Sequence, residues 1–183
     1  MLTANIDVGR SIVAFRNEDG KTELTISTAP LADVESFPAA HLIPSPGFSA
    51  ETALKQAAEI ITSFTDSNNY FHIDCSDVIS ICASAAIHII RFTAGDDPSK
   101  AFSDALASQG IAPLCCDGAL INIMAPQNIR LSEATSLVQI VREATQDDAS
   151  IIWGLTLDPQ TKDTEITIIL AEPEKTAAHE TVE

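Results

Sequence analysis

The sequence predicts an α/β two-layer sandwich in which helices pack on a mixed four-stranded sheet. Short apolar runs typical of buried strands alternate with amphipathic helical patterns through the second half of the chain. Glycine and proline mark the ends of several of these runs. The four expected strands cover residues 86–92, 118–123, 150–157 and 165–171.

The stretch from Asp117 to Ala171 carries most of this prediction. Residues 131–144 have a helical pattern whose apolar positions recur at i, i+3, i+4 and i+7. Pro159 ends the strand at 150–157, because proline cannot donate to a strand ladder. Only a short loop at 160–163 separates this strand from the one at 165–171. We therefore expect these two strands to form an antiparallel hairpin.

Two further helices have clear start signals. Ser49 is a suitable N-cap for a helix whose apolar face carries Leu54 and Ile61 and ends near Phe64. Asp97 and the following proline begin a second helix, which Gly110 closes. A shorter apolar helix is expected at residues 78–83.

Residues 1–48 contain a predicted hairpin followed by a proline-rich segment. The strand-like runs 11–16 and 22–27 flank a turn in which Gly20 takes the left-handed conformation. We divide the chain into this N-terminal part, a domain at 49–171 and an acidic tail at 172–183. The broad apolar face of the helix that begins after Ser49 needs a cover, either the N-terminal hairpin or a partner chain.

Composition argues against nucleic-acid binding, membrane insertion and secretion. The formal net charge is −16 and the ten basic residues are scattered, which disfavours binding to nucleic acid. No apolar run is long enough to span a bilayer, and the N-terminus has no secretion-signal pattern. We expect a cytoplasmic protein with no membrane partner. The cysteines show no zinc-binding spacing and are expected to be free, buried thiols; they are Cys75, Cys82, Cys115 and Cys116.

Three motifs in order resemble one family. They are Gly118-Ala-Leu-Ile-Asn-Ile123, the run 149–159 that reads Ala-Ser-Ile-Ile-Trp-Gly-Leu-Thr-Leu-Asp-Pro, and Glu165-Ile-Thr-Ile-Ile-Leu-Ala171. Together they resemble the C-terminal domain of FtsZ, the bacterial tubulin-like division GTPase. The resemblance extends upstream to Ser49, whose helix is similar to the end of the central FtsZ helix, and it implies the FtsZ/tubulin C-terminal fold. It ends at 172–173, where Glu-Pro replaces the family's Thr-Gly.

The segment Phe71–Val78 permits two interpretations. From the residues alone, Asp74 ends a strand and Ser76 or Asp77 caps the following helix. The segment also resembles the loop that FtsZ inserts into the nucleotide site of the neighbouring subunit. That resemblance implies a loop acting in trans, whose polar residues are His72, Asp74 and Asp77. It also implies an interface made by Phe71, Ile73, Cys75 and Val78.

Glycine spacing argues against a nucleotide site in this chain. Loops that cradle phosphates need clustered glycines, and the seven glycines here lie far apart. The chain is therefore expected to be no enzyme and to hold no cofactor or metal. We expect a GTPase-less, FtsZ-like interaction protein that binds or caps FtsZ-type filaments. The alternative is a module that forms homodimers or binds a small ligand on the same fold; an enzyme of another type is the third hypothesis.

Overall fold

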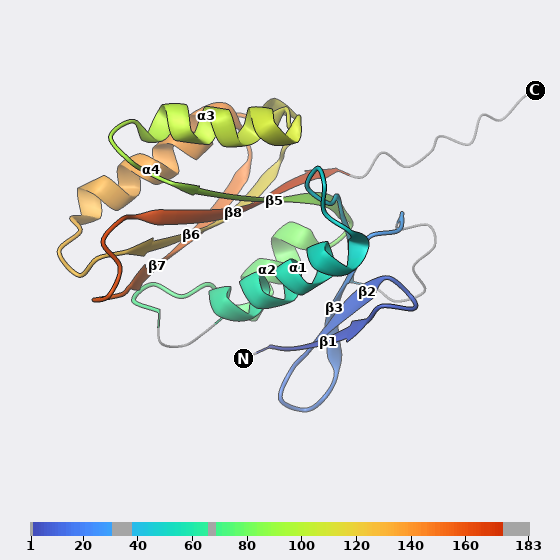
Figure 1. The fold of residues 1–183 in the computed structure, drawn as a ribbon. Helices are drawn as coiled ribbons and strands as arrows, with labels where there is room; N and C mark the ends of the chain where they lie inside the picture. The colour runs from blue at the N-terminus through green and yellow to red at the C-terminus, as the bar shows by residue number, and fades with distance from the viewer. Residues whose placement is uncertain (1, 31–37, 66–68, 174–183) are drawn as a thin grey trace, which may run out of the picture.

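One sheet connects all the strands that the structure describes (Figure 1). The structure is a computed structural model, and it describes residues 2–30, 38–65 and 69–173. Eight strands lie in the order β1-β2-β3-β4-β5-β8-β6-β7 in this part of the chain. Their bounds are β1 (Thr3–Asp7), β2 (Ile12–Arg16), β3 (Thr22–Ser27), β4 (Ala39–Leu42), β5 (Ala85–Thr93), β6 (Gly118–Ala125), β7 (Ser150–Leu157) and β8 (Glu165–Pro173).

Helices cover both faces of the half of the sheet that is formed by β5, β8, β6 and β7 (Figure 1). The helices are α1 (Ala50–Phe64), α2 (Cys75–Cys82), α3 (Pro98–Gln109) and α4 (Leu131–Ala144). Strand β8 shows how the two faces are made: Ile166 and Ile168 pack with α3 and α4, whereas Ile169 packs with α1 and α2. Because neighbouring side chains of a strand point to opposite faces, a continuous apolar run fills two cores.

The structure corrects the expected two-layer sandwich with four strands. Its α/β character is confirmed, but the sheet has eight strands in the described residues, and the helices form a layer on each face. The additional strands come from residues before 49. Strand β4 joins them to the predicted part by pairing parallel with β5, His41 beside Ala86 and Leu42 beside Ile87. With only four residues and neighbouring prolines, β4 gave no periodic signal.

The predicted hairpin of β7 and β8 is wrong. Strand β8 pairs antiparallel with both β5 and β6, and β7 pairs parallel with β6 at the edge. All but one of the residues from Ile166 to Ala171 are buried, so β8 gains more from a place between two strands than from an edge. The connection from Asp158 to Thr164 is long enough to cross β6, since neighbouring strands lie ~5 Å apart.

The predicted helix boundaries are largely confirmed. Ser49 caps α1 by accepting a hydrogen bond from the backbone N–H of Thr52. Asp97 caps α3 in the same way, and Gly110 ends that helix at φ 67°. Helix α4 has the predicted bounds. Helix α2 begins at Cys75, three residues before its predicted start, and β8 extends through Glu172 and Pro173, which we assigned to the tail. Residues 174–183 of that predicted tail lie outside the described residues.

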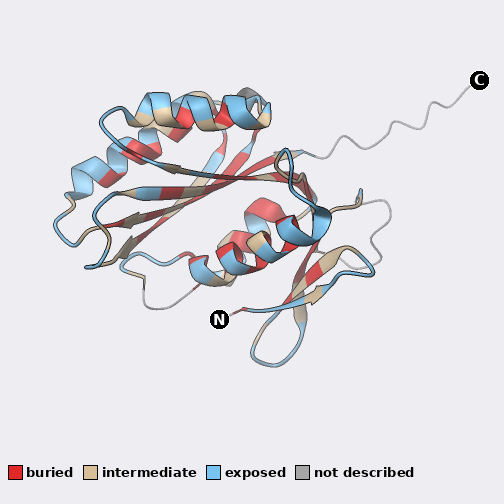
Figure 2. Ribbon diagram, viewed as in Figure 1, coloured by how far each residue is buried: buried red, intermediate tan, exposed pale blue. Residues whose placement is uncertain are grey.

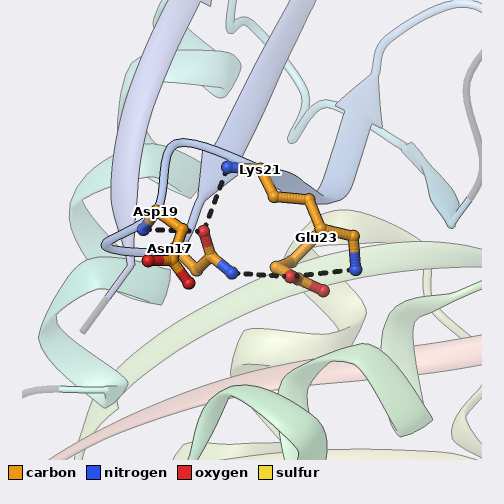
Figure 3. Close-up of polar contacts among 4 residues, drawn as sticks. All are labelled: Asn17, Asp19, Lys21 and Glu23. Atoms are coloured by element: carbon orange, nitrogen blue, oxygen red, sulfur yellow. Dashed lines mark hydrogen bonds and ion pairs between the residues drawn. The ribbon is translucent and has the colours of Figure 1, made fainter.

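The predicted N-terminal hairpin is confirmed and is extended by β1 into a three-stranded antiparallel meander. At its turn, the Asn17 side-chain oxygen accepts hydrogen bonds from the N–H groups of Asp19 and Lys21, at 3.1 and 3.0 Å. The Asn17 amide donates to Glu23, which also pairs with the Lys21 ammonium at 3.3 Å (Figure 3). Gly20 has φ 78°, which confirms its predicted left-handed conformation.

The meander covers helix α1, which is the first of the two covers expected for the apolar face of this helix. Leu2, Phe15 and Leu24 belong to the same buried cluster as the apolar face of α1. Figure 2 shows the buried residues of α1 along the sides that face the strands. The other wall of the cluster comes from Leu120 and Ile169 of the central strands. Helix α1 is therefore held between two parts of one sheet.

We predict that Phe15→Ala lowers the free energy of unfolding by about 3–5 kcal/mol, because the side chain is fully buried in this cluster. Guanidinium unfolding followed by circular dichroism measures the change. Val8→Ala is the control, since Val8 is 51% exposed. Its effect should stay within about 0.5 kcal/mol. Equal effects of the two substitutions would mean that the meander does not pack on α1.

Candidate functional site

The segment Asn69–Asp74 is held against the edge strand β7 and the end of α1. Phe71 forms an isolated antiparallel bridge with Leu155, through backbone hydrogen bonds of 3.1 and 2.9 Å. The Asn69 amide donates to the carbonyl oxygens of Ser63 and Phe64, at 3.1 and 3.3 Å. Its side-chain oxygen accepts from the Thr156 hydroxyl at 2.8 Å. Side-chain and backbone bonds thus fix the start of the candidate loop.

Gly154 makes this close approach possible. A Cβ atom at position 154 would lie 2.8 Å from the carbonyl oxygen of Phe71 and 3.2 Å from Cγ1 of Ile73. The first distance is shorter than any ordinary contact, and the atom that would have to move is backbone. A residue without a side chain is therefore needed where the loop crosses β7.

Asp74 and Asp77 form a reciprocal capping box at the start of α2. The Asp74 carboxylate accepts a hydrogen bond from the backbone N–H of Asp77, and Asp77 accepts one from the N–H of Asp74, both at 3.0 Å. The Ser76 hydroxyl also donates to Asp74, at 2.6 Å. Asp74 is thus the N-cap, which corrects the expectation that Ser76 or Asp77 would cap the helix.

These bonds lower the pKa of the Asp74 carboxyl. The hydrogen bond from Ser76 is the largest cause, the backbone N–H of Asp77 adds to it, and the charge of nearby His72 contributes less. Because the pKa is depressed in the folded state, the stability gained is present above the unfolded pKa and is lost as pH falls through the folded pKa. Asp74 therefore carries its negative charge at neutral pH.

The predicted interface residues divide into two groups. Phe71 is 41% exposed, and His72 and Asp74 are also exposed. Ile73 and Val78 are only 1% and 0% exposed and belong to the cluster around α1, so their side chains anchor the loop. This differs from our expectation that both would contact a partner. Cys75 is half-buried against the same cluster, and burial raises the pKa of its thiol.

An aromatic cluster beside the loop was not predicted as part of the site. The ring of Phe71 lies edge-on to the ring of Tyr70 at 4.9 Å between centroids, and to the ring of Trp153 at 5.6 Å. Tyr70 is 66% exposed. The sequence placed Trp153 on a strand and Phe71 on a loop 82 positions away. The backbone bridge between Phe71 and Leu155 brings the two rings together.

Metal-binding clusters and membrane-spanning helices are absent from the described residues. No three histidine, cysteine or acidic side chains lie together there in a way that could hold a metal ion. No helix in the described ranges is long and apolar enough to cross a membrane. The cysteines are free. Cys82 and Cys116 are buried, and burial raises the pKa of each thiol to about 12, whereas Cys115 is exposed and so departs from the expected burial.

We predict that Gly154→Ala destabilises the protein by about 1–3 kcal/mol, because the new methyl group must displace the Phe71 backbone. The denaturation midpoint gives the loss of stability. The shift should accompany a change in the fluorescence of Trp153, the only tryptophan. The control is Gly9→Ala, whose Cβ would have its nearest neighbour at 3.4 Å. A Gly154→Ala protein as stable as the Gly9→Ala protein would contradict the tight crossing.

Residues 100–173 match the FtsZ family, C-terminal domain. The cell division protein FtsZ 1 of Methanocaldococcus jannaschii is 28% identical over 118 residues, which is 61% of this chain and 31% of that protein. FtsZ of Methanothermobacter thermautotrophicus is 29% identical over 110 residues, 57% of this chain and 29% of the relative. The chain thus spans about a third of the length of the curated relatives it matches.

Solved structures share the fold. An empty FtsZ dimer of M. jannaschii superposes with a TM-score of 0.54 at 23% identity, covering 70% of this chain and 41% of that one. CetZ from Methanosaeta thermophila gives 0.51 at 9% identity, with 74% and 52% covered. TubZ protofilaments of Bacillus thuringiensis give 0.52 at 13% identity, with 67% and 35% covered. Residues 100–173 are thus similar to the C-terminal domain of the FtsZ family, and they lie within a longer region that has the fold of these structures.

Proposed function

We propose that this chain is a cytoplasmic, FtsZ-like interaction protein of cell division, which binds the end of an FtsZ-type filament through the surface of Phe71–Val78. The observation that supports this most is the loop itself. Hydrogen bonds hold it against β7 and α1, it presents Phe71, His72 and Asp74 to solvent, and it lies in a chain similar to FtsZ over 118 residues. An ordered loop loses little conformational entropy when it docks.

We expect filament capping because the chain has a loop like that of FtsZ but lacks the nucleotide-binding face. The resemblance implies that FtsZ subunits stack the loop face of one on the nucleotide face of the next. This chain has the loop but no glycine cluster to form a phosphate-binding face. It would add to a filament end whose nucleotide is exposed and would offer no nucleotide site to a further subunit. In this proposal the chain itself binds no GTP and is not an enzyme.

The capping box leaves carboxylate oxygens for a partner. One oxygen of Asp74 accepts both bonds described above, and one oxygen of Asp77 accepts the bond from the Asp74 N–H. The second oxygen of each carboxylate takes no part in the box. In the proposed complex these oxygens would orient the water that attacks the γ-phosphate in the partner's site, as positioned carboxylates do.

The expected result of mixing this protein with a cognate FtsZ and GTP is shorter filaments at ratios well below one to one, because a cap acts on ends. Sedimentation and electron microscopy across a titration measure filament mass and length. Equilibrium dialysis of the protein alone should show no GTP binding at micromolar concentrations. Unchanged filaments at equimolar protein would rule out capping. A protein that instead forms dimers and leaves filaments intact would support the self-associating alternative.

Asp74 permits a test that separates its two roles. Asp74→Asn keeps a good N-cap and removes the charge, whereas Asp74→Ala also removes the cap, at about 1 kcal/mol. If the carboxylate acts in trans, both variants should bind filaments and both should lower GTP turnover at capped ends. Asp77→Ala should likewise still bind and cap filament ends. Turnover with Asp74→Asn equal to that of the unaltered protein would assign Asp74 to helix capping alone.

A further inference from the structure

Strand β7 forms an open edge of the sheet next to the candidate loop. Its ladder partner is β6, and on its other side only Phe71 pairs with it among the described residues, at Leu155. Both backbone groups of Leu155 point outward to Phe71. The N–H groups of Ser150 and Asp158 point inward, to carbonyl oxygens of the β6 side. Since strand residues alternate, the N–H and C=O groups of Ile151 and Trp153 point outward.

These outward groups have no backbone partner in the described part of the chain. The chain passes Phe71 antiparallel to β7, and residue 73 would lie opposite Trp153 if the pairing continued. Instead Ile73 turns into the core and α2 begins at Cys75. The bridge therefore stops one pair short of Trp153, and no described segment pairs with the outer side of the first half of β7.

The edge also lacks the features by which natural proteins prevent unwanted strand pairing. Edge strands are usually protected by charged side chains, proline or a bulge. Strand β7 reads Ser-Ile-Ile-Trp-Gly-Leu-Thr-Leu, with neither charge nor proline, and its pairing with β6 is without a register shift. The opposite edge, β1, is polar, contains Asp7 and is exposed along most of its length. The whole chain carries a net charge of −16, yet β7 has no charged side chain. The missing protection is therefore a feature of β7 and not of the protein surface in general.

The surroundings of β7 are acidic. Exposed Asp147 and Asp148 precede the strand, and half-buried Asp158 follows it. From Gln146 to Glu165 there are five carboxylate side chains and one lysine, Lys162. A second copy of this acidic chain would be repelled here, whereas a segment carrying lysine or arginine would be attracted.

We propose that the open edge of β7 at Ile151–Trp153 binds an extended, basic segment of a partner protein, which adds as an antiparallel strand. Its apolar side chains lie beside Ile151 and Trp153, and its basic side chains alternate with them on the other face. Backbone hydrogen bonds supply affinity and the alternating side chains supply specificity, as in other cases of strand addition. This site adjoins the loop surface, since the rings of Trp153 and Phe71 are in contact, but it does not depend on the filament role.

Trp153 lies within the proposed site and is the only tryptophan, so its fluorescence reports binding directly. The probe is a seven-residue peptide of alternating lysine and valine, blocked at both ends. We expect a saturable change in Trp153 emission. A peptide with glutamate in place of lysine should bind at least tenfold more weakly.

N-methylated peptides test the backbone bonds. In the added strand, residues whose side chains lie beside Trp153 direct their N–H groups towards β7. N-methylation of the valines should therefore abolish binding, whereas N-methylation of the lysines should have little effect. Equal binding of both N-methylated peptides would overturn strand addition.

Ile151→Pro gives the matching change in the protein. The substitution removes an outward N–H and leaves the ladder with β6 intact, as proline does at sheet edges. Binding should fall at least tenfold, whereas Ile151→Val, which keeps the N–H, should bind normally. Circular dichroism must show that both variants are folded. Failure of the basic peptide to change Trp153 emission at millimolar concentration, or unchanged binding by Ile151→Pro, would overturn the proposal. Sedimentation velocity gives a further test. If the unaltered protein forms a dimer that Ile151→Pro abolishes, β7 binds a second copy of the chain, and the proposal is overturned.

Discussion

The burial of helix α1 is the interaction on which the rest of the structure depends. Seven of its fifteen residues are buried, too many for one surface to cover. The central strands cover one side through Leu120 and Ile169, and the N-terminal meander covers another through Phe15 and Leu24. One continuous cluster results, and fully burying one such apolar side chain contributes about 1.5–3 kcal/mol. The four N-terminal strands thus take part in the same core as the FtsZ-like region.

The position of α1 in turn fixes the candidate site. The carbonyl groups at its C-terminal end bind Asn69, and Asn69 binds Thr156 on β7. Phe71 can then cross β7 because Gly154 has no side chain there. Asp74 follows as the cap of α2. Core packing, a close backbone crossing and a capping box together fix the position of the loop.

The sequence predicted local features better than their arrangement. Ser49, Asp97 and Gly110 were recognisable because caps depend on neighbouring residues in the chain. The place of β8 was not, because an apolar run fits an edge hairpin and a central strand equally well until its partners are known. Strand β4 was too short for a periodic signal. For the site, the carboxylates of Asp74 and Asp77 were found from the sequence, but Tyr70 and Trp153 required the contact between distant segments.

Native-state hydrogen exchange tests most directly whether the meander and α1 share one core. The account predicts that the amides of buried residues in β2 and β3, such as Phe15 and Ile26, exchange with the same opening free energy as Ile61 in α1 and Ile169 in β8. That common value should equal the global free energy of unfolding. Opening of β2 and β3 at a free energy more than about 2 kcal/mol lower, with α1 still protected, would show that the meander is a separate unit and would contradict the account.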